Sequence, residues 1–196
     1  MIAVVDYGAG NLNSVKKAFD YLGADVVVTD QCQTVTGADK IILPGVGHFS
    51  SLRTLTRTGL REALLRAAGA GKPLLGLCLG MQWLFDGSEE SIEIAGASIF
   101  SGTCRRFPSS VKSPHVGWNS LTVQEGSRLL RGIAPDSFVY YTHSFHAPVL
   151  GATTAASEYG LQFSAAVERN NIFGVQFHPE KSGDVGLAIL KNFCEI

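Results

Sequence analysis

The sequence has no long apolar run and no long run of charge of one sign. A bilayer-spanning helix needs about 20 consecutive apolar residues, and the first apolar stretch already reaches an acidic residue at Asp6. The 16 basic and 17 acidic residues leave a formal net charge of -1, so we do not expect a nucleic-acid-binding surface. No basic segment precedes an apolar stretch near Met1, so we expect no secretory signal and a cytoplasmic protein.

Cysteine is scarce, and the four cysteines are too widely spaced to form a disulfide framework or a paired-cysteine zinc site. We therefore expect Cys32, Cys104 and Cys194 to be buried or incidental thiols. Glycine-rich dinucleotide and P-loop patterns are also missing, which argues against binding of a phosphorylated nucleotide. Cys78 is the exception among the cysteines, because of its sequence context.

What the chain does contain is a regular alternation of strand-like and helix-like segments. A length of 196 residues suits one domain with a sizeable core. Apolar runs predict strands, and apolar residues at helical spacing predict helices. The predicted strands cover residues 2–6, 25–28, 40–43, 72–77 and 171–176, and the predicted helices cover residues 12–22 and 60–68. Such alternation favours an α/β fold with a parallel sheet covered on both faces.

The stretch from about 97 to 165 differs, because it is richer in short β-like segments such as 137–142. We expect it to add antiparallel strands. We find no repeat, low-complexity segment or linker that would mark a second domain.

The most informative segment is Gly76-Leu77-Cys78-Leu79-Gly80. The spacing Gly-x-Cys-x-Gly matches the pattern of a nucleophile elbow, in which the nucleophile stands at a sharp turn from strand to helix. Glycines on both sides remove Cβ atoms that would clash in such a turn. The free N–H groups at the start of the following helix favour a thiolate. The segment predicts that Cys78 is a nucleophile, although a cysteine in an apolar run is also commonly an inert core residue.

Two further segments strengthen that interpretation. In Phe177-His178-Pro179-Glu180, residues two apart in an extended chain share a face, so Glu180 can orient the ring of His178. This is the base and orienting group that a cysteine nucleophile needs. In Pro44-Gly45-Val46-Gly47, a strand runs into a glycine-rich turn whose amides, with that of Leu79, could bind an oxyanion. All three segments follow predicted parallel strands, so they should meet at one edge of the sheet.

The order of Pro44–Gly47, Gly76–Gln82 and Phe177–Glu180 resembles that of the class I (triad) glutamine amidotransferases. The resemblance covers essentially the whole chain. It implies a flavodoxin-like α/β fold with a mostly parallel central sheet, helices on both faces and additional antiparallel strands. It also implies a single glutamine amidotransferase type 1 domain over residues 1–196.

Within that family, the sequence looks like the glutaminase subunits of imidazole glycerol phosphate synthases, which serve histidine biosynthesis. The segments that carry this finer resemblance are Asp6–Asn11, Pro114–Asn119, His143-Ser144 and Gly174–Gly183. Sister glutaminases for anthranilate, aminodeoxychorismate or pyridoxal phosphate synthesis remain alternatives. A stand-alone γ-glutamyl cysteine hydrolase is another.

The resemblance implies roles for individual residues. It implies a catalytic triad of Cys78, His178 and Glu180 that hydrolyses glutamine to glutamate and ammonia without a cofactor. The oxyanion hole would use Gly45, Val46 and Leu79, glutamine would lie near Gly47, Gln82, His143 and Ser144, and a partner would face Asn11, Trp118, Tyr140 and Lys181. The implied partner is a cyclase subunit with a (β/α)8 barrel, joined as a heterodimer. That subunit uses the ammonia to form imidazole glycerol phosphate and an aminoimidazole carboxamide ribonucleotide.

Three points remain open at this level. The flexible glycines around Val46 would allow a peptide rotation that makes or breaks the oxyanion hole, so we expect weak activity without the liganded partner. His48, which follows the turn, is expected to face solvent. A metal site is a weaker alternative, because no metal-binding motif supports one. It would have to be built from His115, His143, His146, His178 and Glu180.

Overall fold

Strands and helices alternate along the computed structural model, which describes residues 1–196. The strands are β1 (Ile2–Val5), β2 (Val26–Thr29), β3 (Lys40–Leu43), β4 (Leu74–Leu77), β5 (Gly87–Ser88), β6 (Thr103–Arg106), β7 (His115–Ser120), β8 (Thr122–Val123), β9 (Phe138–His143), β10 (Phe145–His146), β11 (Thr153–Glu158), β12 (Gln162–Arg169) and β13 (Ile172–Val175). The helices are α1 (Leu12–Tyr21), α2 (Cys32–Gly37), α3 (Arg53–Arg57), α4 (Leu60–Gly69), α5 (Leu79–Trp83) and α6 (Gly183–Glu195), with short 3-10 turns η1 (Phe49–Leu52) and η2 (Pro179–Lys181).

An eight-stranded sheet in the order β2-β1-β3-β4-β13-β12-β11-β8 organises the molecule. Its first five strands are parallel, and the remaining three are antiparallel to their neighbours. A three-stranded sheet, β10-β6-β5, and a two-stranded ribbon, β7-β9, complete the β structure. The predicted α/β class with a mostly parallel sheet and added antiparallel strands is confirmed, and strand 40–43 matches its prediction residue for residue.

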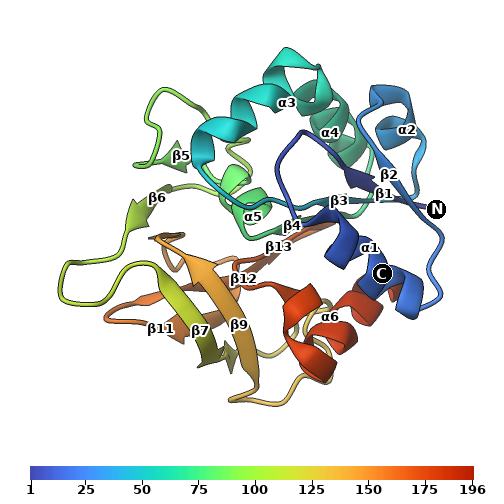
Figure 1. The fold of residues 1–196 in the computed structure, drawn as a ribbon. Coiled ribbons are helices and arrows are strands. Elements are labelled where there is room, and N and C mark those ends of the chain that lie inside the picture. The colour runs from blue at the N-terminus through green and yellow to red at the C-terminus, as the bar shows by residue number, and fades with distance from the viewer.

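Helices cover both faces of the parallel strands (Figure 1). The helices α2, α3 and α4 lie on one side of the sheet, and α1 and α6 lie together on the other. Side chains alternate between the two faces along each buried strand, as the pleat of a strand requires. In β3, Ile42 packs with one core cluster, whereas Ile41 and Leu43 pack with the other.

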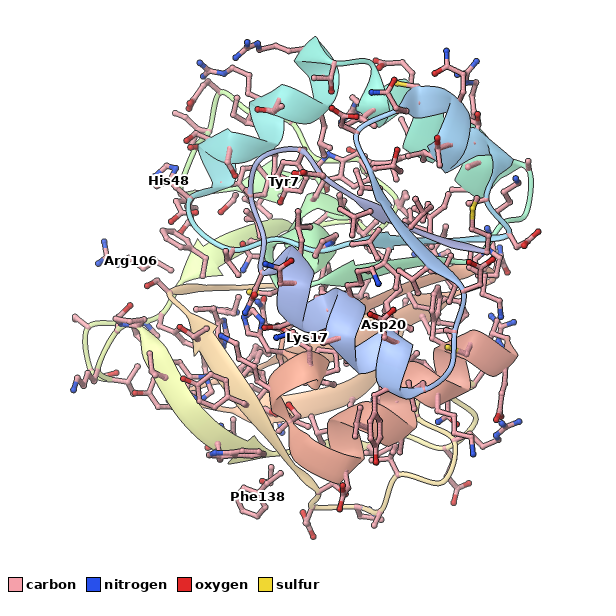
Figure 2. All side chains as sticks on the ribbon, turned by 45° about the vertical axis from the view of Figure 1, so that its right-hand side comes forward. Tyr7, Lys17, Asp20, His48, Arg106 and Phe138 are labelled. Atoms are coloured by element: carbon pink, nitrogen blue, oxygen red, sulfur yellow. The ribbon has the colours of Figure 1, made fainter.

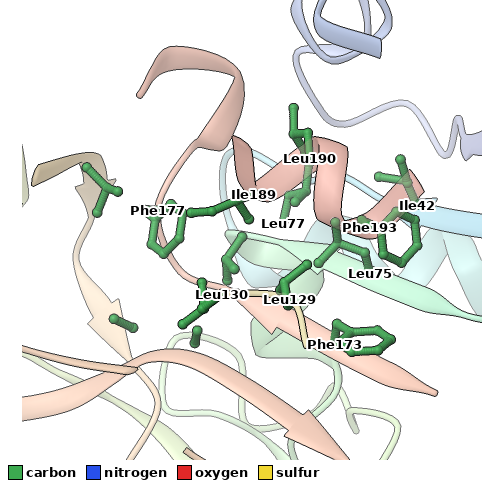
Figure 3. Close-up of a cluster of buried hydrophobic side chains, with 14 of the residues drawn as sticks. Ile42, Leu75, Leu77, Leu129, Leu130, Phe173, Phe177, Ile189, Leu190 and Phe193 are labelled. Carbon is green, nitrogen blue, oxygen red and sulfur yellow. The ribbon is translucent and has the colours of Figure 1, made fainter. Parts of the chain in front are cut away.

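The core under α1 and α6 combines aliphatic and aromatic side chains (Figure 3). Phe193 of α6 lies against Phe173 of β13, with their ring centroids 6.0 Å apart. Lys40, at the start of β3, donates its ammonium protons to the carbonyl oxygens of Phe193 and Cys194. The last turn of α6 is therefore held to the sheet by both packing and a cation at its carbonyl end, a placement that the helix dipole favours.

The antiparallel half lies beside the parallel strands and continues the same sheet (Figure 1). It contains the ribbon β7-β9, which lies next to β11. None of the helices has the length and apolar character needed to cross a bilayer. The strands β4 and β13 are neighbours at the centre of the sheet, so the segments that follow them are brought together at one edge.

Candidate active site

Cys78 stands in a strained backbone conformation between β4 and α5. Its φ is 52° and its ψ is -106°, a region that residues with a side chain rarely adopt. The flanking glycines make the turn possible. A Cβ on Gly76 would lie 2.6 Å from the backbone of Gly80, and a Cβ on Gly80 would lie 1.9 Å from the carbonyl oxygen of Leu43. The predicted sharp turn from strand to helix at Cys78 is confirmed. Its flanking glycines are required because the backbone segments pack directly against one another.

His178 and Glu180 form the predicted pair at the end of the neighbouring strand β13. The Nδ1 of His178 lies 2.8 Å from Oε1 of Glu180, and both side chains are buried. The Nε2 atom of His178 and the Oε2 atom of Glu180 are buried and have no hydrogen-bond partner within the chain. A ring held at Nδ1 with Nε2 left unpaired is the arrangement of a general acid and base beside its nucleophile.

The electrostatics of this pair follow from its neighbours. Burial by itself lowers the pKa of His178, because the charged ring loses its hydration. The Cys78 sulfur and the Glu180 carboxylate outweigh that effect and raise the pKa of His178 to about 10. The ring is therefore protonated at neutral pH when a thiolate faces it.

The glycine-rich turn Pro44–Gly47 after β3, called the oxyanion turn below after its expected role, contacts the elbow directly. Its geometry is not that of an oxyanion hole. The Leu79 N–H donates to the carbonyl oxygen of Gly45 over 3.3 Å, so one of the expected donors is already occupied. Gly45 is buried in a tight contact, since a Cβ there would lie 2.5 Å from the Tyr7 hydroxyl. Val46 is exposed. The oxyanion hole expected from Gly45, Val46 and Leu79 is not formed in this conformation, and it stays a prediction that requires rotation of the Gly45–Val46 peptide.

A cavity of about 270 Å³ opens over the cysteine. This volume lies just below the range of roughly 300–1,000 Å³ typical of drug-sized ligands, so it suits a ligand of amino-acid size. The residues predicted to hold the substrate all line it. The lining is formed by Val46, Gly47, Cys78, Leu79, Gln82, Glu90, Pro114, Thr142, His143, Ser144 and Phe145.

Glu90 is a lining residue that the sequence did not indicate. It belongs to the loop after β5, and its Oε2 accepts a hydrogen bond from the Phe49 N–H over 2.7 Å. The same loop approaches the oxyanion turn a second time, where Ser91 Oγ lies 3.5 Å from Nδ1 of the exposed His48. The loop has no periodic pattern, so only the folded chain shows that a carboxylate lies in the cavity.

Gln82 lines the cavity, but its amide nitrogen is used inside the protein. Its Nε2 donates to the carbonyl oxygen of Phe145 over 2.9 Å and to Oε1 of Gln176 over 3.1 Å. The amide of Gln176, a residue that the sequence did not indicate, in turn donates from Nε2 to the Cys78 sulfur over 3.6 Å. The side-chain oxygen of Gln82 is therefore the amide atom that remains available to a ligand.

The remaining buried histidines near the cavity form a hydrogen-bonded chain. His143 Nδ1 lies 2.9 Å from the Phe145 carbonyl oxygen, and His143 Nε2 lies 3.0 Å from His115 Nδ1. The carbonyl can only accept, so His143 donates from Nδ1 and accepts from His115 at Nε2. Burial lowers the pKa of His143 to about 3 and that of His115 to about 4. No group of three or more histidine, cysteine, aspartate or glutamate side chains has a metal-binding arrangement.

The residues expected to face a partner lie mostly on one surface, close to the triad. Trp118 of β7 lies edge-on to Tyr140 of β9, with their ring centroids 6.1 Å apart, and the Lys181 ammonium lies 5.9 Å from the centroid of Tyr140. The sequence did not indicate Val116 or Phe138, whose exposed side chains belong to the same ribbon. Phe138 projects from the ribbon into solvent (Figure 2). Trp118, Tyr140, Lys181, Val116 and Phe138 are called the aromatic face below.

Asn11 is the N-cap residue of α1, because its side-chain oxygen accepts a hydrogen bond from the Ser14 N–H. The helix that it begins lies next to η2. A partner role for Asn11 remains a prediction.

Strand β9 links the aromatic face to His178. The His178 N–H donates to the Tyr140 carbonyl oxygen over 2.9 Å. The buried hydroxyl of Ser182 bridges the same two residues, since it accepts from the Tyr140 N–H over 3.0 Å and donates to the His178 carbonyl over 2.6 Å. A shift of His178 would therefore disturb the hydrogen bonds that join it to strand β9, which carries part of the aromatic face.

Comparison with known proteins identifies the family of this chain. The sequence model of the family described as glutamine amidotransferase class-I matches residues 3–196. The chain belongs to this family. Solved structures described as glutamine amidotransferase and as PurLQS from Thermotoga maritima show the class-I glutamine amidotransferase fold. Their TM-scores are 0.77 and 0.74 at 18% and 20% identity, with 99% of this chain covered in each case and 100% and 97% of the other chain.

Among class-I glutamine amidotransferases, two relatives are similar over their full length. The subunit HisH of imidazole glycerol phosphate synthase from Methanothermobacter thermautotrophicus is 47% identical over 100% of this chain and 98% of its own. The corresponding subunit from Moorella thermoacetica is 46% identical over 100% of this chain and 94% of its own.

Proposed function

We propose that this chain is the glutaminase subunit of an imidazole glycerol phosphate synthase. The observation that carries the proposal is the strained cysteine beside a buried His-Glu pair, in a cavity of amino-acid size. The full-length similarity to HisH subunits supports the choice of this enzyme over the sister glutaminases.

The first chemical half-reaction uses Cys78 and His178. The Cys78 thiolate attacks the side-chain carbonyl carbon of glutamine and forms a tetrahedral intermediate. The protonated His178, held by Glu180, gives its Nε2 proton to the departing nitrogen, so that the C–N bond breaks and ammonia leaves. A thioester between Cys78 and the γ-glutamyl group remains. The raised pKa of His178 supports this order, because the ring begins the cycle as the acid.

The second half-reaction regenerates the cysteine. His178, now neutral, removes a proton from a water molecule as it attacks the thioester carbonyl, and glutamate leaves as the C–S bond breaks. In the cavity, the Glu90 carboxylate is the group suited to the ammonium of glutamine, and the Gln82 oxygen and the Ser144 hydroxyl are suited to its other donors. Gly47 and His143 complete the wall.

The oxyanion turn supplies a reason for control by the partner. Both half-reactions place a negative charge on the carbonyl oxygen, yet the Leu79 N–H is bonded to the Gly45 carbonyl. Rotation of the Gly45–Val46 peptide would remove that carbonyl and present the Val46 N–H instead. We expect the isolated chain to be a weak glutaminase for this reason.

The proposed partner is a cyclase subunit with a (β/α)8 barrel that binds the aromatic face. Exposed aromatic side chains are typical anchors of protein interfaces. Ammonia loses its nucleophilic lone pair when it is protonated in water, so delivery inside a heterodimer favours its use by the cyclase.

The deciding experiment is ammonia release from glutamine by the purified chain, alone and with a barrel cyclase plus its nucleotide ligand. We expect slow release alone and strong stimulation by the liganded partner. Cys78→Ala is the control and should abolish release in both conditions, because no second nucleophile is in reach. Full turnover by the lone chain would indicate an autonomous hydrolase, and no release in either condition would contradict the assignment of the partner.

A further inference from the structure

The buried side chain of Gln176 is the part of the site that the triad leaves unexplained. It is fully buried, and its Nε2 lies 3.6 Å from the sulfur of Cys78, within hydrogen-bond range for sulfur. Gln176 directly follows strand β13, two residues before His178, so both side chains leave the extended chain on the same side. A buried amide aimed at the reacting atom is a costly arrangement unless its polar atoms are paired.

The orientation of the Gln176 amide is fixed, through Gln82, by the backbone carbonyl of Phe145. The Phe145 carbonyl oxygen can only accept, so the atom of Gln82 that faces it at 2.9 Å must be the nitrogen. The second hydrogen of that nitrogen points at Gln176 over 3.1 Å, and the atom that receives it must be Oε1. The remaining end of the Gln176 amide, the N–H end, is therefore forced to face Cys78.

We propose that Gln176 is a further catalytic residue, which donates an N–H hydrogen bond to the Cys78 thiolate and holds it in the position of attack. The inference rests on the proposed function, because it assigns a role within glutamine hydrolysis. An N–H donor stabilises the thiolate over the thiol, since the thiolate is the stronger acceptor. The bond weakens when the sulfur becomes a neutral thioester, so Gln176 acts on the free enzyme more than on the intermediate.

Other titratable groups lie around the sulfur, and the test must separate them from Gln176. They are His178 and Glu180 at η2, Tyr7 after β1, His143 at the end of β9 and Glu90 in the loop after β5. All of these remain unchanged in a Gln176 variant. The comparison of variants therefore isolates the amide.

The first test is the rate of Cys78 alkylation by iodoacetamide as a function of pH, which needs no glutamine and no partner. Gln176→Met keeps the length of the side chain and removes the donor. Gln176→Glu keeps the acceptor for Gln82 and places an oxygen against the sulfur. We expect the pH midpoint of alkylation to rise by about one unit in Gln176→Met and by more in Gln176→Glu, with kcat lowered about tenfold or more and KM little changed.

Gln162→Glu on the exposed part of β12 is the matched control and should leave the midpoint unchanged. A midpoint in Gln176→Met equal to that of the unsubstituted chain would overturn the proposal. A shifted midpoint in a chain that never releases ammonia would leave the role of Gln176 intact and count against the proposed function alone.

A second measurement avoids any Gln176 variant and covers the case in which both variants unfold. The side-chain amide resonances of Gln176 are followed through a pH titration of the unsubstituted chain and of Cys78→Ala. We expect them to shift with the same midpoint as alkylation in the first protein and to lose that shift in the second. Resonances that ignore the ionisation of the sulfur would overturn the proposal.

Discussion

The parallel and antiparallel halves of this molecule contribute different parts of the site. The parallel strands β3, β4 and β13 end at the glycine-rich turn, at Cys78 and shortly before His178. The antiparallel half contributes His143 and Ser144 to the cavity wall, to which α5 and the loop after β5 also contribute, and it carries most of the aromatic face. Under the proposed function, the parallel half supplies the reacting groups, and the antiparallel half supplies contacts to the ligand and to the partner.

The two buried histidines of the cavity show the same division. His178, beside the Cys78 sulfur and the Glu180 carboxylate, has its pKa raised to about 10. His143, bonded to a carbonyl and to another histidine, has its pKa lowered to about 3. Burial lowers both values, so the difference comes from charged neighbours. Under the proposed function, the His178 ring serves as the proton donor of the reaction, and the His143 ring stays neutral as part of the cavity wall.

The largest effect should follow from a methyl group added at the elbow. Gly80→Ala places a Cβ 1.9 Å from the Leu43 carbonyl oxygen, so strands or turn must move. We expect a loss of about 3 kcal/mol or more in the free energy of unfolding, with loss of glutaminase activity. Gly69→Ala, in α4, meets no atom within 4 Å and serves as the control in chemical denaturation. Equal stability of the two variants would contradict the tight packing of the parallel half.

A smaller and more selective effect is expected on the aromatic face. Trp118→Ala should weaken binding of the partner by about 2 kcal/mol, roughly 30-fold, because exposed tryptophans at interfaces are common anchors. The free energy of unfolding should change by no more than about 0.5 kcal/mol. Tyr21→Ala, an exposed aromatic on α1, is the control for titration calorimetry. Lys181→Ala tests the cation on the same face, and unchanged affinity and coupling would remove it from the interface.

Acid should destabilise the antiparallel half through its neutral histidines. Since the pKa of His115 falls to about 4 on folding, the unfolded chain binds the proton first as the pH drops below the ordinary value of about 6.5. The free energy of unfolding should therefore decrease from about pH 6.5 toward 4, by up to about 1.4 kcal/mol per pH unit for this group. Above about pH 6.5, His115 should make no contribution to the pH dependence of the free energy of unfolding.

His115→Gln removes this titration and keeps an amide donor for His143. We expect the slope of stability against pH in urea denaturation to shrink by about 1 kcal/mol per pH unit. An unchanged slope in His115→Gln would show that the ring is already protonated in the folded protein.

The smallest effect concerns Tyr7, beside the oxyanion turn. Its hydroxyl is buried without a hydrogen-bond partner, and burial raises the pKa of the phenol, so the group is a neutral donor with nothing to bind. Tyr7→Phe removes that unpaired group, and we expect the free energy of unfolding to stay the same or rise by up to about 1 kcal/mol. A clear loss of stability in thermal denaturation would mean that the hydroxyl is bonded in solution.

The two halves also differ in how far the sequence predicted them. The elbow, the His-Glu pair and the strands that carry them were predicted correctly, because each is a local pattern of a few neighbouring residues. The hydrogen bond between Gln82 and Gln176 joins residues 94 apart, and Glu90 reaches Phe49 across 41. A pattern within one segment cannot indicate a contact with a distant segment. The roles of Gln176 and Glu90 were therefore found only in the folded chain.

Short elements escaped prediction for a related reason. The helices α2 and α3 are only 6 and 5 residues long, less than two turns each, and they bury few side chains. Their apolar residues cannot establish a 3.6-residue period. The aromatic face was predicted in part, since Trp118, Tyr140 and Lys181 came from resemblance to a family. Val116 and Phe138 became visible only through their exposure on the ribbon.

The backbone hydrogen bond between Tyr140 and His178 gives the molecule a built-in reporter. The amide proton of His178 belongs to the segment after β13, yet its acceptor belongs to strand β9, which carries part of the aromatic face. Its rate of exchange with solvent therefore measures how often these two segments separate. The amide resonance of His178, measured without substrate, can therefore show whether a change on the β7-β9 ribbon alters the segment that carries His178.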